Sequence, residues 1–188
     1  MANNRSRTAA KVTKTAETAS PAEAAKTAEV IYENAHIVPK EIDPHQYITV
    51  KNGFHGELVY RSARTGELFT WNSFGSEQEM ELQELRNAKN TAKDFFINNW
   101  FMFGQDDSWV IDYLGLERYY RYAVGVDGFD EIFRKTPAEI KKIVKELSAG
   151  QKKSMAYRAA DMISSGEIDS RKVIAALEDA LGVELIEK

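Results

Sequence analysis

Residues 47–72, YITVKNGFHGELVYRSARTGELFTWN, contain three short runs with the composition of β-strands. The runs YITVK, ELVYRS and ELFTW alternate polar and apolar side chains or carry β-branched and aromatic ones, which favours extended backbone. Asn52-Gly53 and Thr65-Gly66 lie between the runs and tolerate the positive φ of tight turns. We therefore expect an antiparallel meander of three strands, with helices over one face because three strands cannot bury both faces alone.

A long helix is predicted directly after these strands. Ser76 and Glu79 match a capping box, in which a hydroxyl and a carboxylate accept hydrogen bonds from free backbone N–H groups. Apolar residues then recur at helical spacing, namely Met80, Leu85, Ala88, Ala92, Phe95 and Phe96. The helix is expected to end near Phe103, before Gly104.

The segment 95–133 is dense in aromatic residues. Short helices are expected near 108–114, 116–123 and 127–134, separated by glycines. Tyr and Trp are enriched in protein interfaces, so we interpret the cluster as core or as a subunit interface, with a base-stacking platform as the alternative. The candidate interface residues are Trp100, Phe101 and Trp109. Trp100 is equally compatible with plain core.

Residues 135–188 are predicted to form a unit of three helices. Thr136-Pro137-Ala138-Glu139 combines a capping box with a proline at the first helical position, which is typical of a helix start. A second helix is expected over about 150–164. A third is expected to start at Asp169 as its cap and to end at Gly182.

Residues 1–29 are rich in Ala, Thr, Lys, Glu and Ser and offer little apolar surface for a core. Residues 1–28 carry five cationic and two acidic side chains, so this segment has a net charge of +3 and the rest of the chain −7. We expect an extended basic arm that docks on an acidic surface, with a solubilising tail as the alternative. Its candidate docking residues are Arg5, Arg7, Lys11 and Lys14. Residues 30–46 are predicted to connect the arm to the body.

Composition and motifs exclude several kinds of chemistry. The chain has no cysteine, which removes disulfides, thiolate zinc sites and cysteine nucleophiles. His36, His45 and His55 do not have the spacing of a metal-binding pair on a helix. The sequence has no phosphate-binding glycine motif, no nucleophile elbow and no run near the roughly 20 apolar residues of a membrane span. We therefore expect no enzymatic activity, no metal, no cofactor and no membrane association.

A group of cationic side chains in the C-terminal half is the best alternative site. Its members are Lys152, Lys153, Arg158, Arg171 and Lys172. Two short helices joined by a tight turn resemble a helix-turn-helix, whose cationic side chains contact phosphates. Asp161, Glu167 and Asp169 dilute this charge. Nucleic-acid binding is therefore an alternative to protein binding.

Three stretches carry a resemblance: NGFHGELVYRSARTGELFTW (52–71), FFINNWFMF (95–103) and LSAGQKKSMAYRAADMISSGEIDSRKVIAALEDALGVELIE (147–187). Together they resemble uncharacterised structural proteins encoded by tailed bacteriophages of Gram-positive hosts, over roughly residues 48–188. The resemblance implies a role in the virion or in its assembly, for a protein made in the host bacterial cytoplasm. It does not distinguish capsid, neck and tail, and it carries over no catalytic or binding residue.

These observations predict an α+β protein with a small three-stranded antiparallel meander, a long helix, a mostly helical C-terminal half and an extended N-terminal arm. The expected units are 1–29, 30–46, 47–134 and 135–188. The expected function is that of a non-enzymatic structural subunit of a tailed-phage particle, binding other copies of itself or other virion proteins. The alternatives are a small DNA-binding regulator or packaging accessory that uses the C-terminal basic helices, and a phage assembly chaperone.

Overall fold

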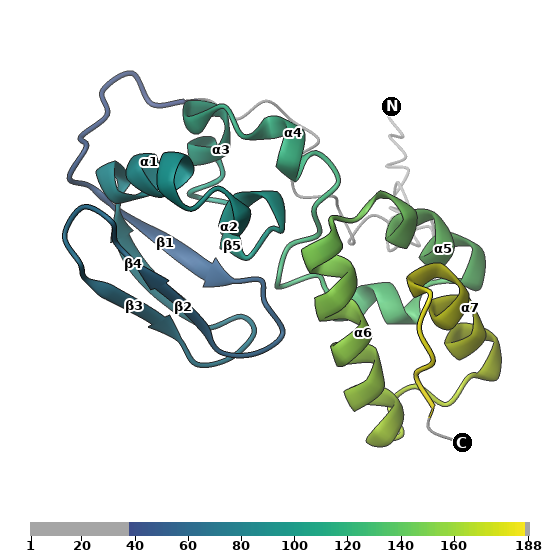
Figure 1. The fold of residues 1–188 in the computed structure, drawn as a ribbon. Helices are drawn as coiled ribbons and strands as arrows, with labels where there is room; N and C mark the ends of the chain where they lie inside the picture. Colours follow the sequence, from purple (N-terminus) through teal and green to yellow (C-terminus); the bar gives the residue numbers. More distant parts are fainter. Residues whose placement is uncertain (1–37, 187–188) are drawn as a thin grey trace, which may run out of the picture.

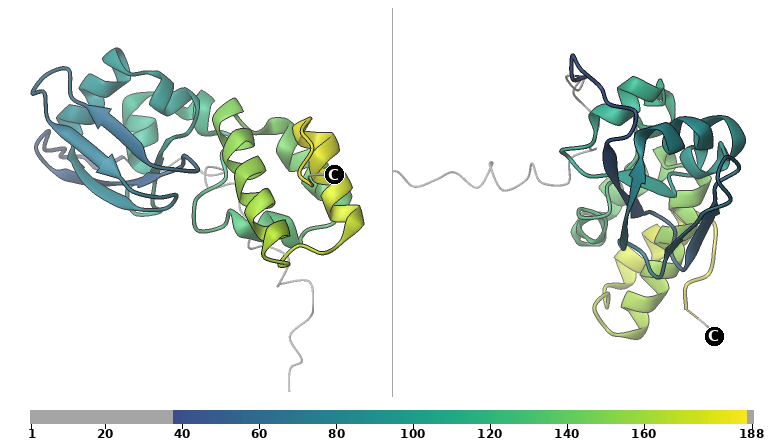
Figure 2. Two further views of the ribbon diagram at one scale, coloured as in Figure 1. Left: turned by 60° about the horizontal axis from the view of Figure 1, so that its bottom comes forward. Right: turned by 90° about the vertical axis from the view of Figure 1, so that its left-hand side faces the viewer.

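The computed structural model describes residues 38–186, which form two adjoining parts, each with its own buried core (Figure 1). The first part contains all the described strands and several short helices, and the second is built mainly from three longer helices. Two further views show the helical part beside the strand-containing part (Figure 2). The predicted α+β class is confirmed.

A three-stranded antiparallel sheet forms the centre of the first part. It is built, in spatial order, from β4 (Glu77–Glu81), β1 (Tyr47–Asn52) and β5 (Phe101–Phe103). In the register of β1, Ile48 lies opposite Met80 and Val50 lies opposite Phe103. Successive side chains of a strand point to opposite faces, so this register places Ile48 and Val50 on the same buried face.

A separate two-stranded hairpin packs against this sheet. It consists of β2 (Leu58–Arg61) and β3 (Leu68–Trp71). The predicted meander is therefore wrong in its pairing, because β1 pairs with β4 and β5 and not with β2. Trp71 joins the two sheets. Its indole is fully buried, and Nε1 donates a hydrogen bond of 2.8 Å to the carbonyl of Val50.

The predicted long helix over 76–103 is also wrong. Its first residues form β4, and the Ser76 hydroxyl donates to the Ser73 carbonyl at 2.6 Å in a turn instead of capping a helix. The helical segments that follow are α1 (Leu82–Thr91) and α2 (Asp94–Ile97). Pairing β4 with β1 buries Met80 completely, and this tertiary gain outweighs the local preference of the segment for helix.

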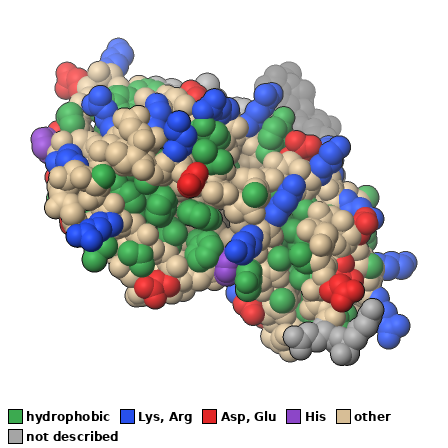
Figure 3. Space-filling model, viewed as in Figure 1, with side chains coloured by type: hydrophobic (Ala, Val, Ile, Leu, Met, Phe, Trp, Pro, Cys, Tyr) green, Lys and Arg blue, Asp and Glu red, His purple; other side chains and the backbone are tan. Residues whose placement is uncertain are grey.

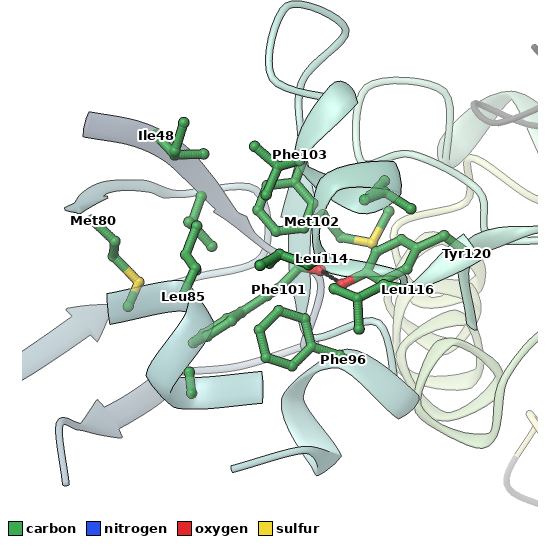
Figure 4. Packing of buried hydrophobic residues seen from close by; sticks show 14 of the residues in the cluster. Ile48, Met80, Leu85, Phe96, Phe101, Met102, Phe103, Leu114, Leu116 and Tyr120 are labelled. Atoms are coloured by element: carbon green, nitrogen blue, oxygen red, sulfur yellow. Dashed lines mark hydrogen bonds between the residues drawn. The ribbon is translucent and has the colours of Figure 1, made fainter. Parts of the chain in front are cut away.

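The first core lies between the sheet, the hairpin and a set of short helices. Besides α1 and α2 these are α3 (Trp109–Leu114) and α4 (Glu117–Tyr120), close to their predicted places. Figure 4 shows how Leu85, Phe96 and Phe101 converge with side chains of the sheet in this core. The Tyr120 hydroxyl donates to the Phe101 carbonyl at 2.6 Å, so the phenol is buried with its polar atom paired.

The three C-terminal helices occur where they are predicted. They are α5 (Pro137–Glu146), α6 (Ala149–Ser164) and α7 (Arg171–Leu181). The capping box at the start of α5 is present, with Thr136 and Glu139 each accepting a hydrogen bond from the other's backbone N–H. The predicted cap of α7 is wrong by one residue. Ser170 and not Asp169 is the N-cap, and its side chain makes no capping hydrogen bond.

The second core extends further back along the chain than residue 135. A 3₁₀ helix, η1 (Asp130–Arg134), precedes α5 and contributes the buried residues Ile132 and Phe133. Val124 and Phe129 also pack into this core, beside Leu177 and the other apolar residues of the three helices. The helical part is therefore larger than the unit predicted from the helix patterns.

Candidate protein-interaction surface

A series of aromatic rings crosses the first part and reaches α6. The half-buried or exposed members, here called the aromatic strip, are Phe54, His55, Phe69, Phe95, Trp100 and Tyr157. Along the series, with Tyr60 beneath as a buried link, the distances between neighbouring ring centroids lie between 3.8 and 6.0 Å. Tyr157 is the most exposed of these residues, at 52%. Ile97, which lies on α2 two residues after Phe95, is 37% exposed. Figure 3 shows hydrophobic side chains gathered on this face, between α2 and β2.

The loop between β1 and β2 presents two members of the strip and is held by one buried amide. The Asn52 side chain is inaccessible to solvent and donates through Nδ2 to the carbonyls of Gly56 and Ser73, both at 2.8 Å. Its Oδ1 accepts a hydrogen bond of 2.8 Å from the backbone N–H of Phe54. Because all of these bonds come from one side chain, the loop has a single arrangement that fixes Phe54 and His55.

Trp100 is positioned by close backbone packing against the same loop. The Gly53 N–H donates to the Trp100 carbonyl at 2.8 Å. A β-carbon at Gly53 would lie 2.1 Å from the Asn99 carbonyl oxygen, so only glycine fits there. Asn99 itself has a φ of 54°, and its Nδ2 donates to the Tyr119 carbonyl at 3.0 Å.

The first turns of α6 dock onto the strip region. The Ser154 hydroxyl donates to the Gly53 carbonyl at 2.9 Å in a buried contact. A β-carbon at Gly150 would lie 2.2 Å from the Asn98 carbonyl oxygen. Gly150 and Ser154 are four residues apart and therefore lie on one face of the helix. This close approach holds α6 against the first part and so places Tyr157 beside the other residues of the strip.

Tyr157 completes the strip by stacking on His55. The two rings are 3.8 Å apart between centroids, with 3° between their planes. Burial lowers the pKa of His55 below its ordinary value, and the positive charge of Lys153 lowers it further. The lowered pKa favours the neutral imidazole, which stacks on the phenol ring without adding positive charge to this end of the strip.

A pocket of about 280 Å³ lies where α6 meets the first part. It is lined by His55, Ser73, Phe74, Ser154, Tyr157, Arg158 and Asp161. The Arg158 guanidinium on its wall is bidentate to Asp130, through Nε at 2.9 Å and an Nη at 2.6 Å. Hydrogen bonding from Arg158 holds the pKa of Asp130 below its usual value. Arg158 is thus engaged within the protein.

The predicted interface residues have different environments. Trp100 is half-buried within the aromatic strip. Phe101 is fully buried in the first core, so it is a core residue and not a surface residue as predicted. Trp109 is half-buried and pairs with Tyr113 at 5.9 Å, outside the ring series of the strip. The predicted arm residues Arg5, Arg7, Lys11 and Lys14 lie outside the described residues.

The predicted nucleic-acid residues are divided between α6 and the start of α7. Lys152 donates to the Lys145 carbonyl at 3.2 Å, and Lys153 lies exposed near His55. Arg171 and Lys172 lie exposed at the start of α7, which follows the far end of α6 (Figure 1). From Lys152 to the end of α6 is a rise of roughly 18 Å. The five cations therefore do not share one compact patch.

Most residues of the strip are not among those that the sequence predicts as interface residues. Phe54 and His55 lie between two glycines in a turn, and the neighbouring sequence does not indicate that their rings pack against other residues. Tyr157 lies on a different element, more than 100 residues later. The unusual placement of aromatic residues in a glycine-flanked turn was the one available signal.

The described residues 38–186 contain no group of three or more His, Cys, Asp or Glu side chains that could hold a metal ion. Over the same range, no helix has both the length and the apolar character needed to cross a membrane. Comparison with protein-family models, with curated proteins and with solved structures found no match.

Proposed function

We propose that this protein is a non-enzymatic structural subunit of a tailed-phage particle, which binds other copies of itself or other virion proteins. The observation that carries the proposal is the aromatic strip. The centres of protein interfaces are rich in Trp, Tyr and Phe, and contiguous exposed apolar surface on a soluble domain marks binding sites. Tyr157 on α6 is the most exposed member of the strip, and the exposed Ile97 lies on α2, which also carries Phe95.

The rigidity of the strip supports binding as its role. Asn52 and Gly53 fix the loop that carries Phe54 and His55, and α6 fixes Tyr157 against them. A partner that docks there orders few side chains, so little conformational entropy is lost on binding. Such a surface suits a subunit that must assemble in one geometry.

The phage part of the proposal rests on sequence. The resemblance to structural proteins of tailed phages extends over roughly 48–188, and a low-complexity basic arm precedes it. We expect the cationic side chains of this segment to dock on an acidic surface of a neighbouring subunit, which would make assembly conditional on docking.

The proposal is tested by quantitative mass spectrometry of virions of the encoding phage, purified through a density gradient. A structural subunit is expected at a fixed copy number per particle that survives repeated purification. Absence from the mature virion, with the protein still abundant in infected cells, contradicts the proposal and supports an assembly chaperone.

The arm is tested by the mass in solution of the full-length chain and of a version lacking residues 1–29. We expect a defined oligomer for the full-length chain and a smaller species for the truncated one. Equal masses would remove the arm from the assembly interface.

A further inference from the structure

A second pocket, of about 320 Å³, lies between α1 and α3, and none of its lining residues belongs to the aromatic strip. Its lining consists of Arg86, Lys89, Asn90, Tyr113 and Leu114. The three α1 residues lie three and four positions apart, so they share one face of that helix. The pocket therefore collects two cations, an amide and a phenol on facing elements.

Lys89 is held in the pocket wall by the end of α3. Its ammonium donates to the carbonyl of Leu114, one of the backbone acceptors left free at the helix C-terminus. The helix ends at Gly115 in the left-handed conformation, with a φ of 63°. This single bond leaves further N–H donors on the ammonium.

Neither of the two cations of this pocket is neutralised by a carboxylate of the described residues. Five other cations have a carboxylate between 2.6 and 3.7 Å away, namely Lys51, Arg64, Arg134, Lys141 and Arg158. Neither Arg86 nor Lys89 forms an ion pair with a carboxylate of residues 38–186. Among the described residues, none with an acidic side chain lines the pocket.

The available groups are donors that suit an oxyanion. The guanidinium of Arg86 has five N–H donors in a planar fork, and the Tyr113 hydroxyl has no hydrogen-bond partner among the described residues. Asn90 uses one of its two amide hydrogens on the Arg86 carbonyl, at 3.2 Å. Together these groups offer more donors than the two oxygens of a carboxylate can use. They suit a phosphate group, which presents three terminal oxygens in an ester and carries more negative charge.

We propose that the pocket between α1 and α3 binds a phosphate group, either as inorganic phosphate or as a small phosphate ester. Arg86 provides the bidentate contact, Lys89 the second positive charge, and Tyr113 a neutral donor. This site is independent of the aromatic strip and goes beyond the proposed function.

The test is a titration of the full-length chain with inorganic phosphate and, in parallel, with glycerol phosphate. Binding is followed by calorimetry in chloride buffer at pH 7.5 and constant ionic strength. We expect saturable binding of at least one of the two ligands. Tighter binding of the ester would identify an ester as the ligand, and tighter binding of inorganic phosphate would identify the free ion. Equal binding would show that the site recognises the phosphate group that the two ligands share.

The variants Arg86→Gln and Tyr113→Phe identify the site, with Lys142→Gln as the matched control. Lys142 is an exposed helical cation without an ion pair among the described residues, so its loss reproduces the change in net charge alone. We expect Arg86→Gln to weaken phosphate binding about tenfold, Tyr113→Phe by a smaller factor, and the control not at all. Absence of saturable binding, equal weakening by Lys142→Gln, or acetate binding as tight as phosphate would overturn the proposal.

Discussion

The two cores of this molecule differ in how far apart in the sequence their contacting residues lie. The strand-containing core joins Val50 to Phe103 and Trp71 to Val50, pairs that local sequence patterns do not connect. The helical core is assembled from helices that begin at caps such as Thr136 and follow one another closely. The comparison shows that the part carrying the aromatic strip depends on a few long-range bonds, and the helical part on local signals.

Removing Trp71 should break the strand-containing core with the largest effect. Trp71→Ala leaves a cavity where the hairpin meets the sheet and loses the bond to Val50, so we expect a loss of about 3–5 kcal/mol in the free energy of unfolding. Urea denaturation measures it. Trp71→Phe is the matched variant, which retains most of the packing but not the bond. A loss below about 1 kcal/mol for the alanine variant would contradict this role for Trp71.

Glu84 ties the hairpin to α1 and gives the second largest effect. Its carboxylate is almost fully buried and accepts hydrogen bonds from the Tyr60 hydroxyl at 2.7 Å and from Arg64 Nε at 3.2 Å. Burial alone would raise the pKa of Glu84, but hydrogen bonds led by that of Tyr60 outweigh burial and hold this pKa below its usual value.

The stability from Glu84 is therefore complete above the unfolded-state pKa of about 4.3 and is lost as the pH falls through the lower folded-state pKa. We expect Glu84→Gln to cost about 1–3 kcal/mol at pH 7 and the cost to shrink in acid. Urea unfolding of the wild type and the variant, at pH 7 and at a pH below the unfolded-state pKa, measures this cost. Glu79→Gln, on the exposed side of β4, is the control with little effect. An equal effect of the two substitutions would contradict the role of Glu84.

The helical core offers the smallest of these effects. Thr136→Ala removes one half of the capping box of α5 and should cost about 1 kcal/mol of unfolding free energy. Ser170→Ala at the start of α7 should cost almost nothing, because that hydroxyl makes no capping bond. Urea unfolding followed by circular dichroism distinguishes the two. Equal costs would show that the caps do not set the stability of these helices.

The same contrast explains which elements the sequence predicts correctly. The cap at Thr136 and the stop at Gly182 are encoded within a few residues of the helices they bound, so they could be read without a structure. In contrast, the segment 77–81 has the polar composition of a helix start. It becomes a strand only because β1, whose paired residues lie 26 to 34 positions earlier (Tyr47↔Glu81 to Lys51↔Glu77), is available to pair with it.

The candidate site shows the same limit. Trp100 could be selected from the aromatic density of its segment, but its neighbours in the strip come from the β1–β2 loop and from α6. Phe101, the next residue, is the first residue of β5, a strand whose three residues are all buried, whereas Trp100 precedes the strand and is half-buried. Which of two adjacent aromatic residues is fully buried depends on where β5 begins to pair with β1, and that pairing is a property of the folded chain.

The most direct test of the aromatic strip as an assembly surface is to measure how well a double variant is incorporated into virions. The variant carries a carboxylate at Tyr157, in the strip, and another at Ile97, on α2. Host cells would supply the gene in trans as wild type, as the double variant Ile97→Asp/Tyr157→Asp, or as Tyr122→Asp. Tyr122 is 46% exposed and lies outside the strip, so it is the matched control. Circular dichroism confirms that each variant folds, and quantitative mass spectrometry of purified particles gives its copy number.

We expect wild type and Tyr122→Asp to be incorporated equally. We expect the double variant to be depleted at least about tenfold, because two carboxylates would be buried unpaired in the interface. A folded double variant present in virions at the wild-type copy number would contradict the aromatic strip as the assembly surface.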